Sequence, residues 1–281
     1  MNNSINILLD NIEKVIVGKR HVLEQLVTAL LCDGHVLIED VPGVGKTQIV
    51  GALARSVNGI FHRIQFTPDV MPSDVMGFSM FNPSTREFEY REGAAMCNFL
   101  LADEINRTSP KTQSSLLEIM EEFQVTVDRK TYSLPRPFMV LATQNPVECF
   151  GTYPLPEAQM DRFFLKLTIG YPGREGEMVI LDRFGSSNPV SVLEPVASTA
   201  DILDLQEQAK RARIEPALKE YIIDIVEETR KSPEVVLGVS PRGSLNLYRA
   251  AKAWAFIKGR EYVLPDDIQQ MAVPVLAHRI I

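Results

Sequence analysis

The segment IEDVPGVGKTQIV, residues 38–50, constrains the fold of this chain more than any other part of it. A phosphate-binding loop reads glycine, four residues, then Gly-Lys-Ser/Thr, and it lies between a strand and a helix. Gly45, Lys46 and Thr47 match this pattern, and Asp40 stands where the first glycine is usual. The apolar run before the loop predicts a buried strand, and the apolar residues at helical spacing after it predict a helix.

The loop has the chemistry to bind an anion. Gly43 and Gly45 allow the backbone to curl so that its N–H groups point inward, and the helix N-terminus adds partial positive charge. Lys46 can reach the outer phosphates of a nucleotide, and the Thr47 hydroxyl can ligate Mg²⁺. If no positive φ is needed at Asp40, its carboxylate can point away from the anion. The alternative is a tight strand–helix turn that contains a lysine and a threonine by chance.

Two carboxylates follow the next strand that the sequence predicts, at residues 99–102 in CNFLLADEINR. In an open parallel sheet, ligands bind at the carboxyl ends of the strands, where Asp103 and Glu104 are expected. Asp103 is predicted to bind Mg²⁺, usually through water. Glu104 is predicted to accept a proton from the attacking water or to orient that water. Taken alone, the pair is also compatible with an ordinary acidic turn.

A third strand is predicted from FMVLATQNP at residues 138–146, which turns from apolar to polar at its end. Asn145 is therefore expected at the same sheet edge as Asp103, where an amide can hold the attacking water against the γ-phosphate. Arg162, in EAQMDRF, could complete the site of a neighbouring subunit as an arginine finger. A surface salt bridge is the alternative for Arg162.

These motifs, together with LGVSPRGSLNLYRAAKAWAFIKGREYVLPDDI, resemble the MoxR family of AAA+ ATPases over nearly the whole chain. The resemblance implies an α/β fold: a parallel-sheet phosphate-loop core with helices on both faces, followed by a small all-helical lid domain. We expect the core at residues 1–170, with hairpin inserts near 75–92 and 124–134, and the lid at 171–281. The glycine- and proline-punctuated IGYPGREGE marks this boundary, and mostly helical patterns follow it.

The resemblance also implies a function, which is Mg²⁺-dependent ATP hydrolysis by a ring-shaped homo-oligomer, usually a hexamer with ATP sites between subunits. Such rings act as chaperones that remodel or mature protein complexes or insert their cofactors, many of them with a partner that carries a von Willebrand factor A domain. The alternative is a nucleic-acid-remodelling motor related to ring helicases. A third reading, a nucleotide-gated scaffold, has no need for a catalytic carboxylate such as Glu104.

Carried over residue by residue, the resemblance assigns roles to a set of positions. Val17 and Gly18 belong to the adenine pocket. Arg242, in SPRG, is the second sensor that reaches from the lid to the γ-phosphate, and a solvated arginine is its alternative. A cation at a helix start opposes the helix dipole unless an anion is nearby. The predicted nucleotide-binding set is Val17, Gly18, Pro42, Gly43, Val44, Gly45, Lys46, Thr47 and Gln48; the metal ligands are Thr47 and Asp103; and the catalytic residues are Glu104, Asn145, Arg162 and Arg242.

Two predicted hairpins bear on what the ring acts on. The first, at residues 75–92, is rich in aromatic residues and carries one more acidic than basic side chain, and we expect it to interrupt a helix and project toward the pore. A pore element that grips phosphates should be basic, so this one favours polypeptide. Phe88 and Tyr90 could instead pack on the protein itself. The second hairpin carries Arg129 and Lys130 at its tip, which either contact nucleic acid or are simply solvated.

Composition narrows the remaining classes. The net charge of −7 makes a nucleic-acid-coating surface unlikely, and three widely spaced cysteines fit a reducing cytosol. The N-terminus does not resemble a signal peptide, and no segment is long enough to span a membrane, so we expect a cytoplasmic protein. Relatives usually continue past the position of Ile281, so the lid is expected to lack a final element.

Overall fold

The computed structural model describes residues 2–41, 43–144, 153–184 and 189–281. Within these residues the central sheet has five strands in the order β2-β5-β8-β1-β9, and every neighbouring pair is parallel. The strands are β1 (Val36–Glu39), β2 (Phe61–Gln65), β5 (Phe99–Asp103), β8 (Met139–Gln144) and β9 (Leu165–Leu167). This confirms the parallel-sheet core. The central strands β1, β5 and β8 are apolar up to their polar carboxyl ends because helices cover both faces of a parallel sheet.

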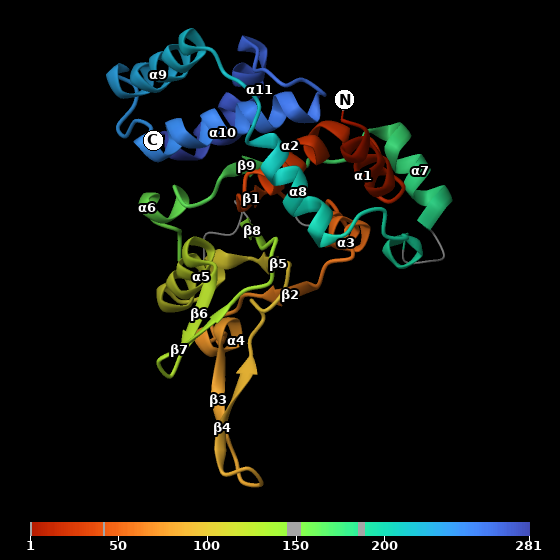
Figure 1. The fold of residues 1–281 in the computed structure, drawn as a ribbon, viewed down its shortest axis with the longest axis vertical. Coiled ribbons are helices and arrows are strands. Elements are labelled where there is room, and N and C mark those ends of the chain that lie inside the picture. The colour runs from red at the N-terminus through yellow and green to blue at the C-terminus, as the bar shows by residue number, and fades with distance from the viewer. Residues whose placement is uncertain (1, 42, 145–152, 185–188) are drawn as a thin grey trace.

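Alternate residues of each strand point to opposite faces of the sheet, so each face has its own core. Leu101 and Leu141 belong to a cluster that includes α1 (Asn3–Glu13), α2 (Arg20–Leu31) and α3 (Lys46–Ser56). Leu100 and Val140 belong to the cluster on the other face. That cluster contains α4 (Pro72–Met76) and α5 (Pro110–Glu122). In Figure 1, α3 lies to the right of the sheet and α5 to its left.

After β9 the chain is helical, as expected for a lid. Its elements are α7 (Arg174–Phe184), η2 (Pro189–Val192), α8 (Thr199–Ala209), α9 (Pro216–Lys231), α10 (Pro241–Ile257), α11 (Pro265–Leu276) and η3 (Ala277–Arg279). Helices α9, α10 and α11 each have proline at the first turn, where its missing N–H and fixed φ are tolerated. Helix α10 packs on α11 and on α2 of the core. The lid therefore shares one hydrophobic cluster with the core, and the boundary at residues 170/171 stays a prediction.

Both predicted hairpins are present. The first pairs β3 (Gly77–Asn82) with β4 (Glu87–Glu92) and extends far from the helical layers (Figure 1). The second pairs β6 (Gln124–Val127) with β7 (Lys130–Ser133). Between them the ring of Tyr90 stacks on that of Tyr132, with centroids 4.0 Å apart, whereas Phe88 is 68% exposed. The prediction that these aromatics pack on the protein is thus confirmed for Tyr90 and wrong for Phe88.

The expectation that the first hairpin interrupts a helix is wrong. Helix α4 precedes it, but no helix resumes in residues 93–98, all of which the structure describes. Instead, the returning chain pairs with the end of α4, where Ala94 N donates to Asp74 O and Ala95 N to Val75 O. A Cβ at Gly93 would lie 2.3 Å from Gly77 N, so this close backbone approach requires glycine. None of the described helices has the length and apolar character that crossing a bilayer requires.

Candidate active site

The phosphate loop joins the carboxyl end of β1 to α3. Gly43 and Gly45 both have φ of 87°, a left-handed conformation that glycine adopts without strain. A Cβ built on either glycine would meet no described heavy atom within 4 Å, so open space borders the loop there. Gly45 caps α3, which leaves the first backbone N–H groups of that helix available to an anion. Lys46 and Thr47 lie in this first turn.

Asp40 points its carboxylate out of the loop, as the sequence allowed. Its Oδ2 accepts hydrogen bonds from the backbone N–H groups of Ile169 (2.6 Å) and Gly170 (2.7 Å). Its Oδ1 accepts from Val41 N at 2.8 Å, and the residue is only 7% exposed. The residue that replaces the usual glycine therefore ties the phosphate loop to the segment that follows β9.

Lys46 lies between the loop and the carboxylates. Its Nζ donates to Asp40 O at 2.7 Å. Burial lowers the pKa of Lys46, and the nearby carboxylates of Asp40, Asp103 and Glu104 oppose that shift. The cation and the acidic pair thus share one site at the carboxyl edge of the sheet, as the sequence predicts.

Thr143, at the end of β8, positions the acidic pair. Its hydroxyl donates to Asp103 Oδ1 at 2.6 Å and accepts from the backbone N–H of Glu104 at 2.8 Å. Glu104 has φ of 56°, a left-handed conformation that is uncommon for a non-glycine residue. Sequence reasoning assigned Thr143 no role, although the abrupt polar end of its strand was a signal.

Three further polar side chains contact the two carboxylates, and sequence reasoning missed all of them. Arg63 Nη2 lies 2.6 Å from Asp103 Oδ2. Gln65 Nε2 donates to Glu104 Oε2 at 2.8 Å, and Arg107 Nε lies 3.1 Å from the same oxygen. Arg63 and Gln65 lie on β2, which pairs with β5, so the register of that pair places Gln65 beside Asp103. The orientation of Glu104 thus depends on an edge strand as well as on its own turn.

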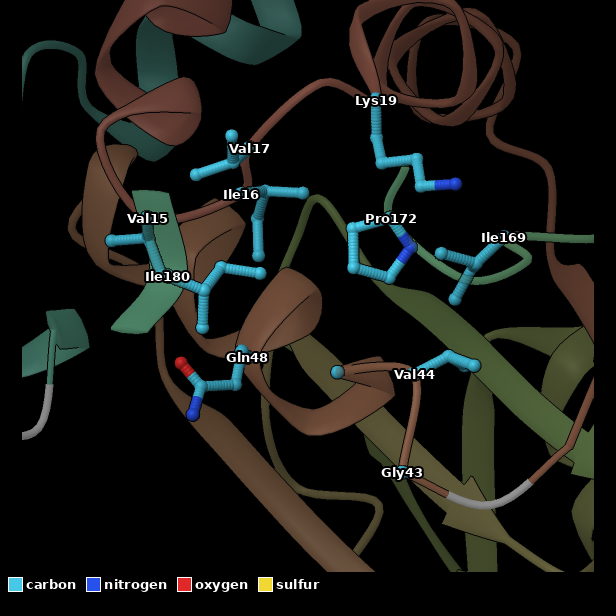
Figure 2. A pocket seen from close by; sticks show the side chains of 11 residues that line it. Val15, Ile16, Val17, Lys19, Gly43, Val44, Gln48, Ile169, Pro172 and Ile180 are labelled. Carbon is cyan, nitrogen blue, oxygen red and sulfur yellow. The ribbon is translucent and has the colours of Figure 1, made fainter. Parts of the chain in front are cut away.

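An apolar cavity of about 220 Å³ adjoins the phosphate loop (Figure 2). Val17, Val44 and Ile169 contribute to its walls, with Ile180 of α7 and Gln48 of α3. Its apolar lining and its position beside the loop suit a flat base whose phosphates bind the loop. The wall from α7 was not expected.

Of the two residues assigned to the adenine pocket, Val17 lines this cavity. Gly18 is not among the residues that line it. Its φ of 69° instead bends the chain between α1 and α2. Pro42 and Asn145 lie outside the described residues.

The two predicted catalytic arginines lie at the opposite edge of the sheet. Arg162 Nη2 is 3.5 Å from Glu121 Oε2, and Arg242 Nη2 is hydrogen-bonded to Glu121 Oε1. Both arginines line a cavity with His35, which immediately precedes β1, whereas the phosphate loop follows β1. Four strand residues at about 3.3 Å each separate the two edges by about 13 Å. The arginines therefore face away from the phosphate loop of their own subunit.

Comparison with known proteins identifies the family. The sequence profile of the ATPase family associated with various cellular activities (AAA) matches residues 35–165, and that of the AAA lid domain matches residues 227–281. Chaperone MoxR1 of Mycobacterium tuberculosis is 44% identical over 96% of this chain and 74% of its own length. The chain belongs to the MoxR family of AAA+ ATPases. Protein MoxR of Paracoccus denitrificans is 31% identical over 95% of this chain and 85% of its own length.

The fold agrees with that of a solved relative of this MoxR-family chain. A crystal structure from Cytophaga hutchinsonii, of a protein described as a candidate ATPase, superimposes with a TM-score of 0.93 and 43% identity. The match covers 99% of this chain and 87% of that one, so core and lid both agree. The MoxR-family chain is therefore an ATPase, and its AAA domain binds nucleotide.

Proposed function

We propose that this MoxR-family ATPase hydrolyses ATP with Mg²⁺ at sites shared between the subunits of a ring, and that the ring remodels or matures protein complexes. The observation that carries the proposal is the division of the site within one subunit. Lys46, Asp103 and Glu104 lie at the carboxyl edge of the sheet, and Arg162 and Arg242 at the amino edge. A head-to-tail interface brings the amino edge of one subunit to the carboxyl edge of the next, and such an interface forms a ring when its rotation closes.

The residues at the carboxyl edge of the sheet would bind ATP and activate the water that attacks it. The N–H groups of the loop and Lys46 bind the outer phosphates, and the cavity beside Val17 takes the base. Thr47 and Asp103 offer the oxygen ligands that Mg²⁺ prefers, and the ion would neutralise charge on the phosphate oxygens. Glu104, held by Gln65 and Arg107, accepts the proton of the attacking water, which Asn145 positions. The neighbour's Arg162 stabilises the charge that develops on the transferred phosphoryl group.

Arg242 belongs with Arg162 in this scheme. The sequence assignment has Arg242 reaching the γ-phosphate from the lid. Both arginines contact one carboxylate, Glu121, so any phosphate that Arg162 reaches is also within the reach of Arg242. We therefore propose that Arg242, like Arg162, acts on the ATP of a neighbouring subunit.

The first hairpin favours protein over nucleic acid as the client. Phe78, Met80, Phe81 and Phe88 are all exposed on it, and the rings of Phe81 and Phe88 meet edge to face with centroids 5.5 Å apart. Exposed apolar side chains that lie together often mark a site where another protein binds. The similarity to a named chaperone supports the same choice. Only the exposed tip of the β6–β7 hairpin, with its basic residues, favours the alternative, a nucleic-acid motor.

Further parts of the proposal rest on the family resemblance. They are a hexameric ring, a cytoplasmic location and a partner that carries a von Willebrand factor A domain. The core at residues 1–170 and the lid at 171–281 are the two domains that we propose.

Mixing two inactive variants tests the shared site. In mixed rings of Lys46→Ala and Arg162→Ala, some interfaces pair an intact phosphate loop with an intact arginine, so part of the ATPase activity should return. Mixing Lys46→Ala with Glu104→Gln is the matched control, because both defects lie at the same edge and no intact interface forms. If the first mixture stays inactive although its subunits exchange, the arginine does not act between subunits.

A further inference from the structure

Glu121 bridges the two arginines within one subunit. It is the second-to-last residue of α5, and its side chain is 40% exposed. Oε1 accepts a hydrogen bond from Arg242 Nη2, and Oε2 lies 3.5 Å from Arg162 Nη2. Each oxygen of a single carboxylate therefore faces a different guanidinium group. Those two groups are the ones that we propose for the ATP of the neighbouring subunit.

The energetics of α5 do not explain an acidic residue at this position. The carboxyl end of a helix carries partial negative charge, so an anion in the last turn is unfavourable there. Glu118 and Glu122 add further negative charge to the same turn, and both line a cavity with Glu121 and Arg162. The favourable partners of Glu121 are thus arginines that other elements supply.

The backbone next to both arginines is held by contacts that do not involve Glu121. Asp161 precedes Arg162, and its Oδ1 accepts from Arg279 Nε at 2.7 Å while its Oδ2 accepts from Ser240 Oγ at 3.0 Å. Ser240 is the N-cap of α10, in which Arg242 is the second residue. Arg279 is buried and also donates to the backbone carbonyl of Asp161 at 3.1 Å. Removal of the Glu121 charge should therefore leave the backbone at both arginines in place.

Two guanidinium groups share one carboxylate in this cluster. Asp161 neutralises Arg279, which leaves Arg162 and Arg242 opposite the one carboxylate of Glu121. A guanidinium group binds carboxylate and phosphate oxygens through the same fork of N–H donors. Glu121 therefore engages the donors that a neighbour's γ-phosphate needs.

We propose that Glu121 is a positioning residue that engages Arg162 and Arg242 within its own subunit and competes with the neighbouring subunit's ATP for them. This inference rests on the proposed action of both arginines between subunits. The competition weakens the interface until ATP occupies the neighbouring site. It makes productive assembly depend on nucleotide, and it prevents two unpaired arginines from meeting a partner that carries no phosphate.

The test measures specific ATPase activity against subunit concentration for wild type, Glu121→Gln and Glu122→Gln. Glu121→Gln keeps the shape of the side chain but removes its charge. The subunit concentration that gives half-maximal activity should fall by about three- to tenfold, the size that two exposed ion pairs allow. Glu122→Gln makes the same charge change one position away, where the described side chains offer no ion pair, and should leave that concentration unchanged.

Repeating the measurement in the Arg242→Ala variant distinguishes competition between Glu121 and ATP from a general effect of charge. In Arg242→Ala the shift caused by Glu121→Gln should shrink, because residues that share a contact are energetically coupled. The inference is overturned if Glu121→Gln leaves the half-maximal concentration unchanged or raises it, or if Glu122→Gln lowers it equally. If instead wild-type activity is independent of concentration and Arg162→Ala is fully active, the shared site itself fails, and that result is distinct from a failure of Glu121 alone.

Discussion

At the scale of single residues, positions that lack an obvious chemical role shape this site. Asp40 binds no phosphate; it accepts backbone hydrogen bonds from Ile169 and Gly170 and so joins two segments that border the nucleotide cavity. Thr143 joins the two acidic residues in the same way. Because each is buried and satisfies otherwise unpaired polar groups, loss of either costs more than one surface contact.

Replacement of Asp40 should therefore destabilise the protein. Asp40→Ala leaves the N–H groups of Ile169 and Gly170 without their acceptor, and each buried unsatisfied donor costs about 1–3 kcal/mol. We expect the free energy of unfolding, measured by denaturant titration, to fall by about 2 kcal/mol or more. Asp40→Asn, which keeps a carbonyl oxygen, should lose less. An Asp40→Ala variant as stable as wild type would show that the bonds contribute nothing.

Replacement of Glu104 should separate binding from chemistry. Glu104→Gln keeps the size of the side chain but removes the proton acceptor, so turnover should fall by roughly 10²-fold or more. Lys46→Ala is the comparison, because it should abolish ATP binding itself. Both are measured by nucleotide titration and steady-state hydrolysis. Hydrolysis by Glu104→Gln within a few-fold of wild type would assign the proton acceptor to another residue.

At the scale of elements, His35 joins three of them at the amino edge of the sheet. It directly precedes β1, its Nε2 lies 2.8 Å from Met120 O of α5, and its Nδ1 lies 3.0 Å from Val140 N of β8. Because Nδ1 accepts the N–H of Val140, the ring is neutral and carries its proton on Nε2. Burial lowers the pKa of His35 to about 4. Protonation would thus remove the bond to β8.

These hydrogen bonds of His35 should make the stability of the protein depend on pH. The folded pKa of about 4 lies below the unfolded value of 6.5, so only the unfolded chain gains a proton between them. The free energy of unfolding should therefore be fully retained above about pH 6.5 and fall by about 3 kcal/mol as the pH drops toward 4. Burial lowers the pKa of His278 to about 3, so that residue adds a loss of the same sign.

Denaturant titrations at several pH values measure this slope. His35→Gln should reduce it, because glutamine offers a donor and an acceptor but does not titrate. His21→Gln, at an exposed position, serves as the control and should keep the wild-type slope. An unchanged slope in a folded His35→Gln variant would contradict the assignment.

At the scale of the whole molecule, the sheet separates the two groups of residues that we propose to act in one reaction. Its carboxyl edge holds the phosphate loop and the acidic pair, its amino edge holds the arginines, and the β3–β4 hairpin extends away from both (Figure 1). The Tyr90–Tyr132 stack connects this hairpin to β7. β7 belongs to the hairpin that follows α5, the helix that carries Glu121.

The client class can be tested through this hairpin. An unfolded polypeptide should raise ATPase activity over the basal rate, and Phe81→Ala with Phe88→Ala should remove most of that stimulation, because it removes the exposed apolar tip. Single-stranded DNA is the comparison. Stimulation by DNA that depends on Arg129 and Lys130, without stimulation by polypeptide, would favour the nucleic-acid motor instead.

Several features of this protein follow from its sequence alone, because local physics controls them. Only glycine adopts φ of 87° without strain, so Gly43 and Gly45, together with Lys46 and Thr47 between a predicted strand and helix, predict the loop. The apolar strand that ends at Asp103 and Glu104 follows from composition over a few residues, and parallel sheets place such ends at one edge. Proline at helix starts marks α9 and α10 in the same local way.

Other features depend on residues far apart in the chain, and only the folded structure fixes them. The bond from Asp40 to Ile169 spans 129 positions, and the meeting of Arg242 with Glu121 spans 121. No local pattern encodes such pairs, because they depend on how whole elements pack. The prediction that a helix continues after the first hairpin is wrong for the same reason. The chain that follows the hairpin pairs with the end of α4, and this tertiary contact outweighs the local helix propensity. The edge of the sheet at which each arginine lies is likewise decided only by the tertiary structure.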